Sequence, residues 1–161
     1  MRLVLAFILG LIALPLIFVL AGIGGLLPIK ATSTPPQWEA GIAMRVLDAS
    51  LEKRAKGLKN PIRADDKAAL AAGGKIYAGK CAVCHGDSKG PSKWGSNDFY
   101  PRVPQFYQGE MDVNPEEAYA AVHDGIRYSG MAAWDGQLTD KQIWQVANFA
   151  ASIKPAEPMK H

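Results

Sequence analysis

The sequence predicts an all-α protein, in which a folded domain of three main helices follows a single transmembrane helix and an amphipathic connector helix. Three observations predict this fold class. Residues 3–27 contain no charged side chain, residues 38–58 have helical periodicity, and helix start signals precede three later segments. The length of 161 residues allows one folded domain plus an appendage.

The charge is unevenly distributed along the chain. The formal net charge is +3, but residues 63–161 contain 11 Lys and Arg against 12 Asp and Glu, a formal charge of −1. The basic excess lies instead at Lys53, Arg54, Lys56, Lys59 and Arg63. The folded domain therefore has no basic patch, and without a recognised motif nothing in the sequence indicates nucleic-acid binding.

The uncharged run near the N-terminus predicts a membrane helix. It spans 25 residues from Leu3 to Leu27, and about 20 apolar residues are enough to cross the hydrocarbon core. A cleaved signal peptide would have a shorter apolar stretch and a small-residue cleavage site, and no convincing site precedes Lys30. We therefore expect residues 1–29 to form a retained transmembrane anchor, with a removed signal peptide as the alternative.

Residues 30–62 are expected to connect the anchor to the folded domain. After a polar, proline-rich break, the apolar residues fall on one stripe of a helix: Met44, Leu47, Leu51, Ala55 and Leu58. This stripe and the basic end of the helix favour a connector that lies on the bilayer or packs on a partner subunit. The alternative is an ordinary solvated helix that caps the domain.

The folded domain is expected to span residues 63–155, with its first helix starting near Asp65. Either Asp65 or Asp66 can cap this helix, which should run to about Gly79. Gly73 lies inside it, where a glycine weakens a helix by roughly 1 kcal/mol. A second helix that crosses at close range would explain this glycine.

Residues 81–85, directly after this helix, read Cys-Ala-Val-Cys-His and include the only two cysteines of the chain. This spacing is typical of covalent haem attachment, because Cys81 and Cys84 can bond the two vinyl groups of one haem and His85 can ligate its iron. A redox dithiol motif lacks the following His and needs a βαβ context. A zinc site needs a second ligand pair, and His123 and His161 have no ligand spacing. The sequence therefore predicts one covalently bound haem c.

The segment from Gly86 to Gly109 has no helical signals but is rich in aromatic residues. These are Trp94, Phe99, Tyr100, Phe106 and Tyr107. A polar loop would not need five aromatic side chains. We expect them to cover one edge of the haem, whose flat apolar faces need burial, and in part to pack on protein.

The second helix of the domain has a clear start signal at Asn114. This cap is followed by Pro115 at the first helical position and by two glutamates in the first turn. The helix should end at Gly125.

The last helix should begin at Thr139. Thr139 and Gln142 have the spacing of a capping box. Pro155 should close this helix, and residues 156–161 should form a flexible tail.

The second axial ligand of the iron has several candidates, which are Met44, Met111, Met131, Met159, His123 and His161. Met131 follows a glycine in a loop between two helices, where the backbone can turn a thioether toward a flat ring. We therefore expect His85 and Met131 to be the metal ligands, with His123 as the main rival. A thioether opposite an imidazole raises the reduction potential relative to two imidazoles and closes the iron to substrates. The alternative role for any of these methionines is to fill a core.

Residues 65–153 resemble the small single-haem class I cytochromes c, and in particular their membrane-anchored bacterial members. The resemblance rests on Gly73 and Tyr77 before the haem motif, on Met131 in its loop, and on Phe149 in the last helix. It implies three main helices around one haem, with the last helix crossing the first.

The resemblance also implies further haem contacts and a location. Pro91 corresponds to a proline whose carbonyl fixes the proximal His, and Arg127 would meet a haem propionate. Many members have proline directly after the ligand methionine, whereas this chain has Ala132, which loosens the loop. Because these proteins receive their haem outside the cytoplasm, the resemblance implies a domain on the periplasmic side of the bacterial inner membrane.

Together these features predict a membrane-tethered electron-transfer protein rather than an enzyme. Iron with two fixed ligands would carry single electrons between respiratory or photosynthetic redox partners, without a small-molecule substrate at the iron. The protein would be a tethered carrier or, as we favour, a subunit of a membrane complex. The alternatives are a peroxidase-like haem enzyme and a haem-based sensor, each of which needs an open or exchangeable sixth site.

Overall fold

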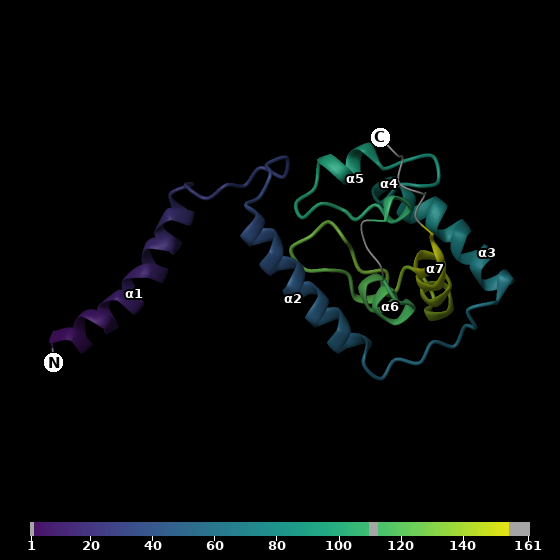
Figure 1. Ribbon diagram of the computed structural model, residues 1–161, viewed down its shortest axis with the longest axis horizontal. Helices are drawn as coiled ribbons and strands as arrows, with labels where there is room; N and C mark the ends of the chain where they lie inside the picture. The colour runs from purple at the N-terminus through teal and green to yellow at the C-terminus, as the bar shows by residue number, and fades with distance from the viewer. Residues whose placement is uncertain (1, 110–112, 155–161) are drawn as a thin grey trace. The chain divides into compact units, whose positions relative to one another are not determined.

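A computed structural model describes residues 2–109 and 113–154. The regular structure in these ranges is helical, apart from two isolated bridges, so the all-α class is confirmed (Figure 1). The helices are α1 (Arg2–Ile23), α2 (Gln37–Ala55), α3 (Lys67–Ile76), the π-helical η1 (Tyr77–Cys81), α4 (Ala82–His85), α5 (Lys93–Asn97), the 3₁₀-helical η2 (Phe106–Gln108), α6 (Pro115–Asp124) and α7 (Asp140–Ser152). The chain forms two compact units that divide between Lys30 and Ala31.

The first unit consists of α1 and the turn that ends it. Gly25 has a φ of +74°, and the amide of Leu26 donates to the carbonyl of Ala21 at 2.9 Å, which closes the helix in a Schellman turn. α1 therefore ends at Ile23, before the uncharged run does. No helix in the described part of the chain is both long enough and apolar enough to cross a membrane. The transmembrane anchor expected over residues 1–29, and the single-pass inner-membrane location that depended on it, are therefore wrong.

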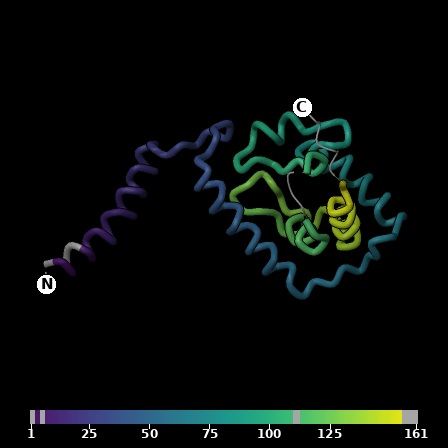
Figure 2. Tube along the Cα trace, viewed as in Figure 1, coloured from purple at the N-terminus to yellow at the C-terminus, as the bar shows by residue number. Residues whose placement is uncertain are grey.

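The core of the second unit is formed by α3, α6 and α7. α7 packs against both α3 and α6, as the trace in Figure 2 shows. Ile143 and Val146 of α7 are almost fully buried in this core. A Cβ atom on Gly73 of α3 would lie 2.1 Å from the carbonyl oxygen of Gln145, so only glycine allows the two helices to cross this closely. The close crossing expected from the sequence is confirmed.

The capping residues expected from the sequence set where the helices of the second unit begin. Asp66 accepts from the amide of Ala69 at 2.9 Å at the start of α3, and Asn114 caps α6. Thr139 and Gln142 form the complete capping box at the start of α7. Each cap satisfies amide groups that the first helical turn leaves without an intrahelical partner.

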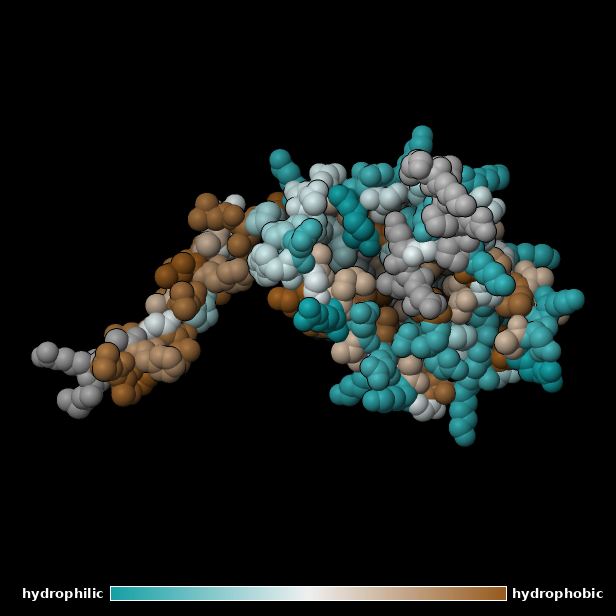
Figure 3. Space-filling model, viewed as in Figure 1, coloured by the Kyte–Doolittle hydropathy of each residue, from teal (hydrophilic) through white to brown (hydrophobic). Residues whose placement is uncertain are grey.

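α2 belongs to the same compact unit as these helices, and not to a separate connector. It packs on α6, where Arg54 pairs with Asp124 and donates to the carbonyl of Ala120 at 3.0 Å. Leu51 is the residue of α2 that is buried. The helix therefore caps the domain, which was the less favoured alternative, and the two compact units divide between Lys30 and Ala31. Figure 3 shows mainly hydrophilic side chains on the visible face of the second unit.

Candidate functional site

The Cys-Ala-Val-Cys-His motif lies on a continuous helical backbone. α3 passes into the π-helical η1, which ends at Cys81, and α4 then carries Cys84 and His85. The sequence expectation of a single helix to Gly79 missed this change to π-helical geometry, which is frequent at functional sites. α4 ends at Gly86, whose φ of +73° favours glycine. The three motif side chains are thus brought together within two short, consecutive helical turns.

Both thiols of the motif are free and half-buried. Burial raises the pKa of the Cys81 thiol to about 11, and burial also raises the pKa of Cys84. Both groups are therefore protonated at neutral pH. A reactive dithiol pair depends instead on a lowered pKa, so this environment does not favour the redox-dithiol interpretation.

His85 is held by a hydrogen bond at one nitrogen. Its Nδ1 lies 2.9 Å from the carbonyl oxygen of Pro104. Because a carbonyl oxygen can only accept, Nδ1 must carry the proton in this bond, and the lone pair of the neutral ring lies on Nε2. Burial lowers the pKa of His85 and favours this neutral form. The ring also stacks on Phe106, with 4.8 Å between ring centroids and 12° between ring planes.

The prediction that Pro91 supplies the carbonyl for His85 is wrong. Pro91 is exposed and directly precedes Ser92, the N-cap residue of α5. The acceptor is Pro104, which precedes η2 and the stacked Phe106. Both prolines lie in the segment of residues 86–109, on either side of α5, and the sequence contains no local signal that distinguishes them.

Side chains satisfy the carbonyl groups at the end of the motif helix. Ser92 Oγ donates to the carbonyl of Val83 at 2.6 Å, and Gln105 Nε2 donates to that of Cys84 at 2.9 Å. The Tyr77 hydroxyl donates to the carbonyls of Gly86, at 3.0 Å, and His85, at 3.3 Å. Sequence reasoning identified Tyr77 only as an aromatic residue and missed Ser92 and Gln105, because a lone Ser or Gln in a loop matches no motif.

Gly95 in α5 lies directly against the motif. A Cβ atom at this position would be 1.8 Å from the carbonyl oxygen of Cys84. No side chain fits there without a shift of backbone. Glycine at this position therefore allows α5 to lie against α4.

Met131 is half-buried in a tight loop between α6 and α7. The amide of Ile126 donates to the Met131 carbonyl at 3.0 Å, and the Met131 amide donates to Ser129 Oγ at 3.1 Å. Next to it, a Cβ on Gly130 would lie 2.4 Å from the ring of Phe99. The methionine loop therefore packs against the same aromatic segment, residues 86–109, that holds His85.

The aromatic residues of this segment make separate contacts. Phe106 stacks on His85, Tyr107 lies edge-on to Tyr77, and Trp94 lies edge-on to Phe99. Tyr100 bonds Glu39 of α2. Two of these residues lie at the positions expected for the axial ligands. Phe106 contacts His85, and Phe99 lies next to Gly130, the residue before Met131.

Residues 68–149 match the model of the protein family described as cytochrome c oxidase, cbb3-type, subunit III. The chain belongs to that family. The matched residues extend from α3 to α7 and include the whole motif, so the second unit contains a c-type cytochrome domain. Haem binding follows from this membership.

Other comparisons add little to this assignment. A solved structure of the reducing HAO-like protein complex of Kuenenia stuttgartiensis is similar at 23% identity and a TM-score of 0.47. The match covers 60% of this chain and 47% of that one, so the chain spans less than half of that neighbour's length. No curated protein matches the sequence.

The side chains of the cytochrome c domain fit a covalently held haem. The two free thiols can bond the vinyl groups of a haem, and the imidazole can ligate the iron through its free Nε2 lone pair. His123 is a weaker candidate ligand, because its Nδ1 lies 2.5 Å from Asp124 and its Nε2 lies 3.8 Å from Asp135. Met111, Met159, His161 and the expected tail at residues 156–161 lie outside the described residues.

Arg127 and Met44 complete the set of predicted residues. Arg127 is exposed in the methionine loop, and its expected contact with a propionate stays a prediction. Met44 is 40% exposed on α2. It therefore offers a comparison position for experiments on Met131.

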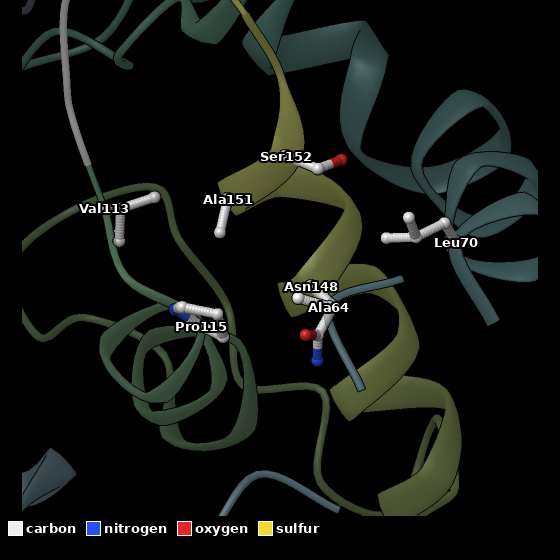
Figure 4. Close-up of a pocket in the computed structure, with 7 residues that line it drawn as sticks. All are labelled: Ala64, Leu70, Val113, Pro115, Asn148, Ala151 and Ser152. Atoms are coloured by element: carbon white, nitrogen blue, oxygen red, sulfur yellow. The ribbon is translucent and has the colours of Figure 1, made fainter. Parts of the chain in front are cut away.

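A pocket of about 190 Å³ lies away from these residues. Figure 4 shows its lining, which comes from α3 and the chain before it, the start of α6 and the chain before it, and the C-terminal half of α7, and comprises Ala64, Leu70, Val113, Pro115, Asn148, Ala151 and Ser152. None of the predicted haem residues lines it. This pocket is therefore no part of the candidate site.

Proposed function

We propose that the protein carries single electrons through one haem c, bonded to Cys81 and Cys84 and ligated by His85 and Met131. The observation that carries this proposal is the 2.9 Å contact between His85 Nδ1 and the Pro104 carbonyl. It assigns the ring proton to Nδ1 and leaves the Nε2 lone pair free to ligate iron, next in sequence to the free thiol of Cys84.

When bound, the haem iron supplies a one-electron redox couple. The protein's own residues prepare the site for it. The Pro104 carbonyl and the Phe106 ring fix the plane of the His85 imidazole, so that this ligand needs no reorientation when the charge changes. Met131 is held by Ile126 and Ser129, and its thioether would close the sixth position to substrates. Electron transfer is therefore favoured over catalysis at the iron.

The family to which the chain belongs is described as a subunit of an oxidase, which supports a role inside a larger redox complex. We propose that the cytochrome domain works outside the cytoplasm, where covalent haem is attached, and passes electrons between partner proteins in respiration. Arg127 would neutralise a haem propionate in this arrangement.

The test of this function is replacement of the proposed sixth ligand. Met131→Ala should abolish the low-spin His/Met optical signature and lower the reduction potential, because a thioether ligand raises it. Met44→Ala, at the exposed position on α2, is the matched control and should change neither property. If the Met131→Ala protein kept the wild-type spectrum and potential, Met131 would not be the ligand.

A haem enzyme or a haem-based sensor is the competing function, and both need an accessible iron. Carbon monoxide binds reduced haem iron only when a coordination position is open or easily vacated. The wild-type reduced protein should bind it poorly, and the Met131→Ala protein should bind it readily. Rapid binding by the wild-type protein would support the competing function.

A further inference from the structure

The end of α4 and its C-cap residue present four consecutive backbone carbonyl groups, those of Val83, Cys84, His85 and Gly86. The end of a helix leaves such groups without intrahelical partners. Here each of the four accepts a hydrogen bond from a side chain of another segment, and the donors are Ser92, Gln105 and Tyr77. Side-chain hydrogen bonds therefore hold the end of α4 in place. Of the three donor residues, Gln105 is the most buried.

Gln105 is one of two buried polar residues in the described part of the chain, and its side chain is 1% exposed. Its Nε2 donates to the carbonyls of Cys84, at 2.9 Å, and Val103, at 2.8 Å. Its Oε1 accepts from the amide of Ser92 at 2.8 Å. These partners also fix the orientation of the amide, because carbonyl groups only accept and a backbone amide only donates. One side chain thus joins the motif helix, the start of α5 and the segment before η2.

Gln105 also directly follows Pro104, whose carbonyl accepts from His85. The backbone carbonyl directly before Gln105 therefore holds the imidazole ring of His85. The side chain of Gln105 holds the carbonyl of Cys84, the residue before that imidazole. The hydrogen bond between Gln105 Nε2 and the Cys84 carbonyl thus constrains the distance between the Pro104 carbonyl oxygen and the His85 ring.

We propose that Gln105 is a positioning residue for the proximal ligand: it holds the Pro104 carbonyl in register with His85 Nδ1 and so tunes the iron through that hydrogen bond. This inference rests on the proposed function, since it concerns His85 as an iron ligand. A carbonyl that accepts from the second ring nitrogen raises the basicity of the ligand nitrogen. A more basic ligand favours ferric iron, so a looser hydrogen bond should raise the reduction potential.

The experiment compares two buried amides in the haem-loaded protein. Gln105→Met keeps the approximate length of the side chain and removes the hydrogen bonds to Cys84, Val103 and Ser92. Asn148→Leu is the matched control, because Asn148 is also buried and bonds Asn60 and the carbonyl of Trp144, away from the motif. At a fixed applied potential, Gln105→Met should lower the ratio of oxidised to reduced protein by about threefold or more, in a one-electron couple that changes tenfold per ~59 mV. Asn148→Leu should leave the ratio unchanged.

A second variant tests whether the donor atom is responsible. Gln105→Glu keeps an oxygen for the Ser92 amide but replaces Nε2, the donor to Cys84 and Val103, with another oxygen. The new carboxylate charge would itself lower the potential, so the readout for this variant is the His85 Nδ1 proton, which should exchange with solvent faster than in the parent protein. A Gln105→Glu protein with the exchange rate of the parent would overturn the proposal.

A measurement on the wild-type protein covers the case in which the variants do not fold. The Nδ1 proton of His85 should exchange with solvent as slowly as the amides of α7, because Gln105 closes the segment around it. Rapid exchange of this proton in a protein with a protected α7 would overturn the proposal. So would equal potentials for Gln105→Met and Asn148→Leu.

These results are distinct from a failure of the proposed function. That function fails if the wild-type protein shows no low-spin His/Met spectrum, whatever residue 105 is. The Gln105 proposal fails alone if the spectrum is present and the potential does not depend on residue 105. The direction of the change in reduction potential also distinguishes the two proposals, because loss of Met131 should lower the potential and loss of Gln105 should raise it.

Discussion

The Nδ1 atom of His85 lies 2.9 Å from the carbonyl oxygen of Pro104, and the same ring stacks on Phe106, two residues further along. A short stretch of irregular chain thus supplies both the hydrogen-bond acceptor and the packing surface for the proposed ligand. The hydrogen bond fixes the tautomer, and the stacked ring limits rotation of the imidazole. Orientation of the proposed ligand therefore depends on Pro104 and on Phe106 at the start of η2, and not on the residues next to the motif.

Pro91→Ala tests this assignment. Since the acceptor is the Pro104 carbonyl, the change should leave the His85 Nδ1 proton signal in nuclear magnetic resonance spectra where it is. It should reduce the free energy of unfolding only by about 0.4–1 kcal/mol, through greater freedom of the unfolded chain. A shifted or rapidly exchanging Nδ1 proton in this variant would mean that Pro91 supports the ring after all.

Gly95→Ala should be among the most damaging single changes near the motif. The new Cβ would lie 1.8 Å from the carbonyl oxygen of Cys84, and backbone would have to move to relieve the contact. We expect the free energy of unfolding to fall by the upper end of about 1–3 kcal/mol, measured by chemical denaturation. The yield of protein with attached haem should fall as well.

Gly79→Ala is the control for this change. Gly79 lies in η1, close to the motif in sequence, and a Cβ there meets nothing within 4 Å. The variant should be as stable as the parent or more stable by about 0.4–1 kcal/mol. Similar losses for Gly79→Ala and Gly95→Ala would show that any alanine near the motif is harmful and that the contact with Cys84 is not the cause.

The sequence was sufficient to predict the helices that have local signals. Asn114 and Thr139 mark the starts of α6 and α7 because capping depends on a few adjacent residues. The crossing at Gly73 was also predictable, because an interior glycine in a helix is costly unless another element needs the space.

The site itself was only partly predictable. The motif names Cys81, Cys84 and His85, but the partners of these residues depend on tertiary contacts. Pro104 acts through its backbone carbonyl, which every residue has, so no pattern distinguishes it from Pro91. The hydrogen bond from Gln105 to the Cys84 carbonyl likewise depends on the tertiary fold, which brings the segment before η2 back to the end of α4.

The two long N-terminal helices were misjudged from their hydrophobic patterns. The uncharged run predicted a membrane anchor, but no helix in the described part of the chain is both long enough and apolar enough to cross a membrane. The apolar stripe of α2 includes the buried Leu51 but also the exposed Met44, and periodicity does not show which surface covers a helix. In the structure that surface is α6 of the same domain.

Gly130→Ala should disturb the methionine loop through Phe99. The new Cβ would lie 2.4 Å from the Phe99 ring, which packs edge-on against Trp94 at a centroid distance of 4.8 Å. We expect a loss of about 1–3 kcal/mol in the free energy of unfolding and weaker ligation by Met131, seen in the optical spectrum. In a Phe99→Ala background the same change should cost less than about 0.5 kcal/mol, because the clash is absent. Equal costs in both backgrounds would show that the two positions are not coupled.

Acid should weaken the packing of α2 on α6 through Asp124. The hydrogen bond from Arg54, and then that from His123, holds the pKa of this carboxyl below its ordinary value of 3.8. The unfolded chain therefore binds this proton more readily than the folded one. The contribution to stability is present at pH values above 3.8 and is lost as the pH falls through the folded pKa.

Arg54→Met tests this contribution against Lys56→Met, which removes a cation of the same region whose ion pair, in the described residues, is with Glu52 four positions earlier. Asp124 is about half exposed, so the pair is screened and should contribute about 0.2–1 kcal/mol. Arg54→Met should reduce the free energy of unfolding near pH 6 by this amount and make its decline between pH 5 and 3 shallower, since less of the pKa difference remains. Lys56→Met should leave that slope as it is. If both variants declined as steeply as the parent, the contact between Arg54 and Asp124 would not hold α2 on the domain in solution.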